Sequence, residues 1–134
     1  MKTSIATVSI AGSLREKLVA IARAGFDGYE IFEPDLIASS MSPEEVRQLS
    51  ADLGLTIDLY QPFRDIEGVS GEQFGRNLRR AEAKFELMGR LGVDLMLVCS
   101  NVGTATIDDD GLAAEQLRAM AELAESYNVR LAYE

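Results

Sequence analysis

Apolar residues recur along the chain in four similar stretches, each of which opens on a residue suited to ending a helix. Glycine or asparagine comes first, an apolar and a polar residue follow, and an apolar run completes the stretch. The four stretches are GFDGYEIF from Gly25, GLTIDLYQ from Gly54, GVDLMLVC from Gly92 and NVRLAY from Asn128. Glycine and asparagine tolerate the left-handed conformation that follows a helix, and short apolar runs indicate buried strands. The pattern therefore predicts a repeated helix–strand unit.

Helical signals precede each of these stretches. Ser13 and Ser42 each stand three residues before a glutamate, which is the pattern of a capping box at a helix start. Longer helices are predicted from about Gly71 to Leu91 and from about Asp110 to Tyr127, where apolar residues recur at helical spacing. The aspartates at 108–110 are interpreted as a cap for the last helix and not as a metal cluster.

A first strand at about Ser4–Ile10 completes the order βαβαβαβαβ, which predicts an α/β fold with a mostly parallel sheet. Two architectures fit: a doubly wound sheet of the flavodoxin type, and the first half of a parallel (β/α) barrel of the TIM type. The end of the sequence directly after VRLAYE favours the barrel, because a doubly wound domain would carry a final helix. We therefore expect residues 1–134 to form a single domain, the N-terminal half of a (β/α)8 barrel from a longer chain.

Composition narrows the function further. The net charge of −9 opposes binding to nucleic acid, and the absence of histidine excludes imidazole catalysis and histidine metal ligands from this sequence. No run approaches about 18 apolar residues, so no membrane span is expected. The single cysteine, Cys99, is interpreted as a packing residue, and we expect a reducing, cytoplasmic setting. No glycine-rich phosphate-binding motif is present.

Polar residues gather where the predicted strands end, which is where parallel α/β folds place their chemistry. The candidates are Glu30, Gln61, Arg64, Ser100 and Glu134, whereas Glu33 is expected to be solvated.

Each candidate also has a structural interpretation. Glu30 interrupts an apolar strand, so it needs either a ligand or an ion-pair partner. Arg64 has the geometry to clamp a carboxylate through two hydrogen bonds, or it pairs on the surface with Asp65 or Glu67. Ser100 either hydrogen-bonds a ligand or shapes a turn.

Several segments resemble bacterial 3-dehydroshikimate dehydratases, which belong to the xylose-isomerase-like (sugar isomerase/epimerase) barrel superfamily. They are SIATVSIAGSLREKL, AGFDGYEIFEPDL, SPEEVRQLSADLGLTIDLYQPFRDIEG and LVCSN. The resemblance runs from Met1 to Glu134, and QPFRD and LVCSN are its most specific parts. It is strongest to dehydratases that carry a hydroxyphenylpyruvate-dioxygenase-like region behind the barrel. It implies a barrel truncated after strand five and a lyase of quinate/shikimate catabolism that converts 3-dehydroshikimate into protocatechuate.

The same resemblance implies one divalent metal ion, Mg²⁺, Mn²⁺ or Co²⁺, held by ligands on strands five to eight. Glu134 corresponds to the first ligand, and the others, with the catalytic residues, are expected beyond residue 134. Glu30, Gln61, Arg64 and Ser100 are carried over as residues that bind the small-molecule substrate, with Arg64 on its carboxylate. We therefore expect these 134 residues alone to be inactive and to self-associate through their uncovered edges.

Two other functions remain open. A sugar isomerase or epimerase of the same superfamily would share the fold, the metal and Glu134, but it would need no carboxylate clamp at Arg64. A half-barrel without catalytic activity, serving as an assembly scaffold, would need neither a metal ion nor the carboxylate clamp.

Overall fold

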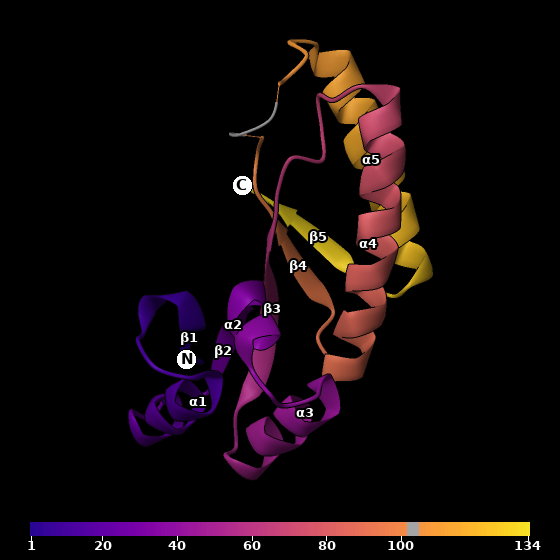
Figure 1. The fold of residues 1–134 in the computed structure, drawn as a ribbon. Helices are drawn as coiled ribbons and strands as arrows, with labels where there is room; N and C mark the ends of the chain where they lie inside the picture. The colour runs from indigo at the N-terminus through magenta and orange to yellow at the C-terminus, as the bar shows by residue number, and fades with distance from the viewer. Residues whose placement is uncertain (102–104) are drawn as a thin grey trace. The chain divides into compact units, whose positions relative to one another are not determined.

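Parallel strands alternate with helices throughout the computed structural model, which describes residues 1–101 and 105–134 (Figure 1). The strands are β1 (Ser4–Ala6), β2 (Gly28–Phe32), β3 (Thr56–Phe63), β4 (Leu95–Val98) and β5 (Arg130–Tyr133). The helices are α1 (Leu14–Arg23), α2 (Glu33–Ala38), α3 (Pro43–Asp52), α4 (Gly71–Leu91) and α5 (Asp110–Ser126), with a 3-10 turn, η1 (Thr7–Ser9). The chain divides into two compact units, residues 1–61 with 88–94 and residues 62–87 with 95–134.

In the first unit, β2 lies between β1 and β3 and runs parallel to both. In a flavodoxin-type sheet β1 would instead lie between β2 and β3, so the order within this unit excludes that alternative. The core of the unit lies between the strands and their helices. Its fully buried apolar side chains include Leu18, Ile21, Tyr29, Ile31, Val46 and Tyr60.

Strand β3 contains a β-bulge. Tyr29 pairs with Ile57 and Glu30 pairs with Leu59, so Asp58 has no partner on β2. The extra residue shifts the rest of β3 by one position against β2. Tyr60 then pairs with Ile31, whose side chain is buried, and Gln61 pairs with Phe32, on the same face as Glu30.

The first strand ends earlier than the predicted Ser4–Ile10, because the chain turns at Thr7. This residue is fully buried, and its hydroxyl oxygen accepts a 3.0 Å hydrogen bond from the Phe32 backbone N–H. Its carbonyl oxygen accepts a 2.9 Å bond from Lys17 Nζ. These side-chain contacts replace strand pairing and allow the turn η1 to form.

Helix α2 was not predicted from the pattern. It begins at Glu33, directly after β2, with a proline in its first turn that cannot extend a central strand. The helix is linked to α1 by a salt bridge, in which Lys17 Nζ lies 2.9 Å from both carboxylate oxygens of Asp35. The Lys17 side chain is only 7% exposed and that of Asp35 18%.

In the second unit, β4 and β5 pair in parallel, as Figure 1 shows. The backbone N–H of Cys99 donates a 3.0 Å hydrogen bond to the carbonyl oxygen of Phe63, at the end of β3. Cys99 is 7% exposed, which confirms its interpretation as a packing residue. The fully buried side chains of this unit include Phe63, Phe85, Met96, Val98 and Met120.

The local signals of the sequence are confirmed. Ser13 and Ser42 both form complete capping boxes, and Asp109 caps α5 by accepting a 3.0 Å bond from the Leu112 N–H. Helix α4 has the predicted bounds, and the residues that open the four repeated stretches all have positive φ: Gly25, Gly54, Gly92 and Asn128. Within the described residues, no helix combines the length and the apolar character needed to cross a membrane.

Candidate functional site

Glu30 and Gln61 form a hydrogen-bonded pair on neighbouring strands of the first unit. Gln61 Nε2 donates to Glu30 Oε2 at 2.6 Å, and both side chains are half-buried. The sequence allows Glu30 either a ligand or an ion-pair partner. Among the described residues Glu30 forms no ion pair, and its hydrogen-bond partner is a neutral amide. The pair therefore presents a carboxylate with one oxygen bound and its charge uncompensated by a cation.

Glu33 lies on the opposite face of the same strands. The expectation that it is solvated is wrong, because α2 begins at this residue and leaves it half-buried. Its carboxylate accepts a short hydrogen bond from the hydroxyl of Tyr60. Burial raises the pKa of Tyr60, and the bond to the anionic Glu33 raises it further. Tyr60 therefore stays protonated at all physiological pH values, as a hydrogen-bond donor.

Arg64 follows β3 directly, in the second unit, and its side chain is exposed. The alternative surface ion pair with Asp65 or Glu67 is absent from the described part of the chain. Within that part, the guanidinium of Arg64 makes no ion pair, so it is available to bind an anion.

Two buried polar side chains anchor the loop that contains Arg64. Asn77 of α4 is fully buried and donates a 2.8 Å bond to the carbonyl oxygen of Asp65. Gln116 of α5 is 5% exposed and forms two bonds with the Val69 backbone, at 3.1 Å from the N–H and 2.8 Å to the carbonyl oxygen. Asp65 itself has φ of 60°, a backbone conformation that is uncommon for residues other than glycine but more frequent for aspartate. Because these bonds replace solvent, the loop has a defined conformation.

Glu67, in the same loop, was considered from the sequence only as an alternative partner for Arg64. The residue is 6% exposed. Its Oε1 accepts bonds from the Asn101 N–H at 3.0 Å and from the Tyr133 hydroxyl at 3.1 Å. Burial raises the pKa of Tyr133, and the bond to Glu67 contributes in the same direction.

The sequence holds a signal that would have found these polar residues. The neighbours of Gln116 one turn away are all apolar, and Asn77 has apolar Phe74 and Ala81 one turn away. A polar residue on a buried helix face requires a partner. Glu67 has no comparable signal, because it stands in a loop where acidic residues are normally solvated.

Ser100 and Glu134 lie together beyond the ends of β4 and β5. The Ser100 N–H donates to the Glu134 carbonyl oxygen at 2.9 Å, and the Glu134 N–H donates to Val98 at 2.9 Å. Both residues are exposed. The structure thus brings Ser100 and Glu134 together in the second unit, which also contains Arg64, and Glu30 and Gln61 together in the first.

The carboxylate of Glu134 fits a hard divalent cation as one ligand, because such ions prefer oxygen donors. It is not sufficient alone, since these ions take six or more oxygen ligands, some of them water. Across residues 1–101 and 105–134, no group of three acidic or cysteine side chains is arranged to hold a metal ion.

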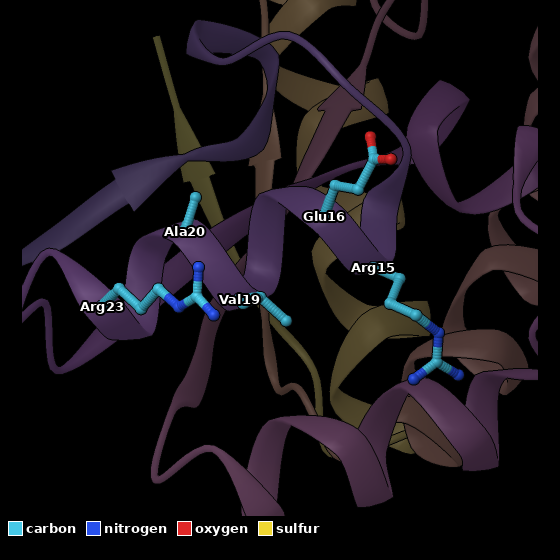
Figure 2. Close-up of a pocket in the computed structure, with 5 residues that line it drawn as sticks. All are labelled: Arg15, Glu16, Val19, Ala20 and Arg23. Atoms are coloured by element: carbon cyan, nitrogen blue, oxygen red, sulfur yellow. The ribbon is translucent and has the colours of Figure 1, made fainter.

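A surface hollow on α1 does not coincide with any of these candidates. Figure 2 shows the five residues that line it, Arg15, Glu16, Val19, Ala20 and Arg23, and all of them come from this one helix. The hollow is lined by one helix and by none of the candidate residues, so it is not the candidate site.

Relatives with assigned names match the entire chain. A protein of Pseudomonas aeruginosa named 3-dehydroshikimate dehydratase is 58% identical over 134 residues, which is all of this chain and 21% of that protein. A solved structure described as a xylose isomerase-like TIM barrel/4-hydroxyphenylpyruvate dioxygenase fusion protein is 53% identical, with a TM-score of 0.96 over 99% of this chain and 21% of its own. The chain therefore spans about a fifth of these relatives.

More distant structures establish the fold alone. The IOLI protein, solved with a bound zinc atom, is 16% identical with a TM-score of 0.83, and the match covers 99% of this chain and 51% of that one. Together with the alternating parallel strands and helices, this likeness confirms the predicted fold class, the first half of a (β/α) barrel. The family model of the xylose isomerase-like TIM barrel matches residues 18–134. The chain belongs to the xylose isomerase-like TIM barrel family.

Proposed function

We propose that this chain provides the first half of a barrel that dehydrates 3-dehydroshikimate to protocatechuate. The 58% identity, over all 134 residues, to a protein named for that activity supports the proposal most strongly. The chain's own contribution is Arg64, an exposed guanidinium without an ion-pair partner in the described residues, on a loop anchored by buried side chains.

Arg64 is proposed to bind the substrate carboxylate. A guanidinium offers two parallel N–H groups that match the two oxygens of a carboxylate, and Asn77 holds the loop next to it. Because the loop is already ordered, little conformational entropy is lost when the substrate binds. Arg64 then orients the ring whose bonds are to break.

Glu30 and Gln61 are proposed to bind a substrate hydroxyl. Gln61 holds one oxygen of Glu30, so the second oxygen keeps a constant direction in which it can accept a hydrogen bond. Ser100 is proposed to contribute a further hydroxyl group to substrate binding.

The reaction removes a proton from the carbon beside the ketone and a hydroxide from the next ring carbon, so one water is lost. A proton shift from the remaining ring CH2 to the ketone oxygen then makes the ring aromatic. Glu134 is proposed as one ligand of a divalent ion whose other ligands, with the catalytic base, lie outside this sequence. When bound, such an ion stabilises negative charge that develops on the ketone oxygen. The choice among Mg²⁺, Mn²⁺ and Co²⁺ and the cytoplasmic setting stay predictions.

Replacing Arg64 in the full-length protein tests the proposal. We expect Arg64→Ala to lower kcat/KM for 3-dehydroshikimate by about 10- to 150-fold, because hydrogen bonds to charged groups contribute about 1.5–3 kcal/mol. Arg64→Lys keeps the charge but not the pair of parallel N–H groups, so its kcat/KM should lie between those of the wild type and Arg64→Ala. Arg76→Ala is the matched control, because Arg76 is an exposed arginine of α4 paired with Glu72.

Two results would contradict the proposal in different ways. If the full-length wild type does not turn over 3-dehydroshikimate with any of the three metal ions, the proposed dehydratase activity is wrong. If the wild type is active and the Arg64→Ala variant has the same kcat/KM, Arg64 does not bind the substrate carboxylate, although the dehydratase activity stands.

A further inference from the structure

Glu67 is an acidic side chain held inside the second unit, 6% exposed, where a carboxylate is costly unless it is bound. Two donors satisfy its Oε1, the Asn101 N–H at 3.0 Å and the Tyr133 hydroxyl at 3.1 Å. Its Oε2 is buried and has no hydrogen-bond partner in the described part of the chain. A buried oxygen without a hydrogen bond lowers the stability of the fold, so stability alone does not explain a glutamate at this position.

The two donors come from the ends of neighbouring strands. Asn101 follows Ser100, beyond β4, and Tyr133 is the last residue of β5. Tyr133 pairs with Val98 across the two strands. A single carboxylate oxygen therefore connects the β3–α4 loop to the ends of both strands.

Both donors are also direct neighbours of candidate site residues, Ser100 and Glu134. Successive side chains of an extended strand point to opposite faces, so Tyr133 and Glu134 project from opposite sides of the chain. Glu67 can therefore hold Tyr133 without occupying the face on which Glu134 lies. The bond from the Ser100 N–H to the Glu134 carbonyl oxygen, at 2.9 Å, connects the two positions directly.

We propose that Glu67 is a positioning residue, which holds the ends of β4 and β5 so that Glu134 keeps the direction needed to bind a divalent cation. The inference extends the proposed function, on which it rests for the role of Glu134. Groups that orient a ligand from behind typically change metal affinity by about 10- to 100-fold when they are removed.

Gln116 provides a comparison within the same loop. It also binds the loop through two hydrogen bonds and is also buried, but it contacts Val69 and neither strand end. If Glu67 only stabilised the loop, removing either side chain would have the same consequences. If Glu67 positions Glu134, only its removal should alter cation binding.

The test measures Mn²⁺ binding to the full-length protein by calorimetry, together with thermal melting and the kcat and KM for 3-dehydroshikimate. We expect Glu67→Ala to weaken Mn²⁺ binding by about tenfold or more. Glu67→Gln should restore the affinity, because its amide oxygen can accept both bonds. Tyr133→Phe removes one donor and should weaken binding less than Glu67→Ala. Gln116→Ala should lower the Tm and leave Mn²⁺ affinity unchanged.

Wild-type Mn²⁺ affinity in folded Glu67→Ala would overturn the positioning role, as would an equal loss in Gln116→Ala. If Glu67→Ala does not fold, the Tyr133→Phe variant provides the test. Unchanged Mn²⁺ affinity in Tyr133→Phe would then overturn the positioning role of Glu67. A wild type that binds no Mn²⁺ also overturns the inference. A wild type that binds Mn²⁺ but does not dehydrate 3-dehydroshikimate contradicts the proposed function instead, and the affinities of the variants still test Glu67.

Discussion

Gln61 donates a 2.6 Å hydrogen bond to Glu30 from the neighbouring strand, and this bond joins two candidate substrate-binding residues. The donor is neutral, so it brings no positive charge to the carboxylate, and the second oxygen of Glu30 is left for another donor. The sequence predicts either a ligand or a cationic partner for Glu30. Its partner in the structure is instead the neutral amide of Gln61.

Removing the amide of Gln61 should destabilise the protein modestly. We expect Gln61→Ala in the full-length protein to lower the free energy of unfolding by about 1–2 kcal/mol, because a half-buried carboxylate loses its donor. Urea denaturation measures the change. A double-mutant cycle with Glu30→Ala should give a coupling of at least about 0.5 kcal/mol, whereas strictly additive effects would show that the bond contributes nothing.

The salt bridge between Lys17 and Asp35 should be costly to break from one side. We expect Lys17→Met to destabilise the protein by about 3 kcal/mol, because Asp35 is then left largely buried without its cation. Asp35→Leu in the same background should recover much of that loss, since two apolar side chains pack without a desolvation cost. Denaturation of the single and double variants measures both values, and a double variant less stable than Lys17→Met would contradict the explanation.

Stability at alkaline pH should depend on Tyr29. Burial raises the pKa of Tyr29 to about 12, and the bond with Ser50 opposes that shift only in part. A phenol whose pKa is higher in the folded state stabilises the fold below its unfolded pKa of about 10, and that contribution is lost as the pH rises through about 12.

We therefore expect the free energy of unfolding to fall between about pH 10 and pH 12, by about 2–3 kcal/mol from this residue. Urea denaturation at a series of pH values, with tyrosinate absorbance as an independent measure, follows the change. Tyr29→Phe should have a flatter pH dependence over this range. An identical dependence in both proteins would show that Tyr29 does not titrate as the structure indicates.

Gly28 should be sensitive to an added side chain, because the side chains of Thr56 and Asp58, on the neighbouring strand β3, fill the space beside it. A methyl group at this position would collide with the Asp58 carboxylate and the Thr56 hydroxyl, which are held together by a 2.6 Å hydrogen bond. We expect Gly28→Ala to destabilise the protein by about 1–3 kcal/mol in urea denaturation. Adding Asp58→Ala should relieve part of the cost, and a double variant with purely additive losses would contradict this explanation.

Local patterns predicted the elements that depend on local physics. The helix starts at Ser13 and Ser42 are confirmed because a capping box involves residues only three positions apart. Helix α4 has the predicted bounds because its apolar face recurs over about five turns, from Phe74 to Leu91. Helix α2 was missed because a six-residue helix is too short for a periodic pattern to appear.

The candidate site was predicted in its residue types and strand ends, but not in its contacts. The bulge at Asp58 is the clearest case. If the register of Tyr29 and Ile57 continued without a shift, Gln61 would stand opposite Glu33 instead of Phe32. The bulge therefore decides that Gln61 meets Glu30 while Tyr60 meets Glu33. A one-residue shift exchanges the two faces of a strand, and no periodicity in the sequence specifies where it occurs.

The sequence by itself therefore determined the repeated helix–strand unit, its helix caps and stops, and the strand ends at which polar residues gather, because each depends on neighbours within a few positions. Only the tertiary structure decided the partners of the buried polar groups. Glu67 contacts Asn101 and Tyr133, which are 34 and 66 residues away in the chain. Such contacts form because packing brings distant backbone segments together and an isolated buried charge would be costly, and neither cause is visible in a local pattern.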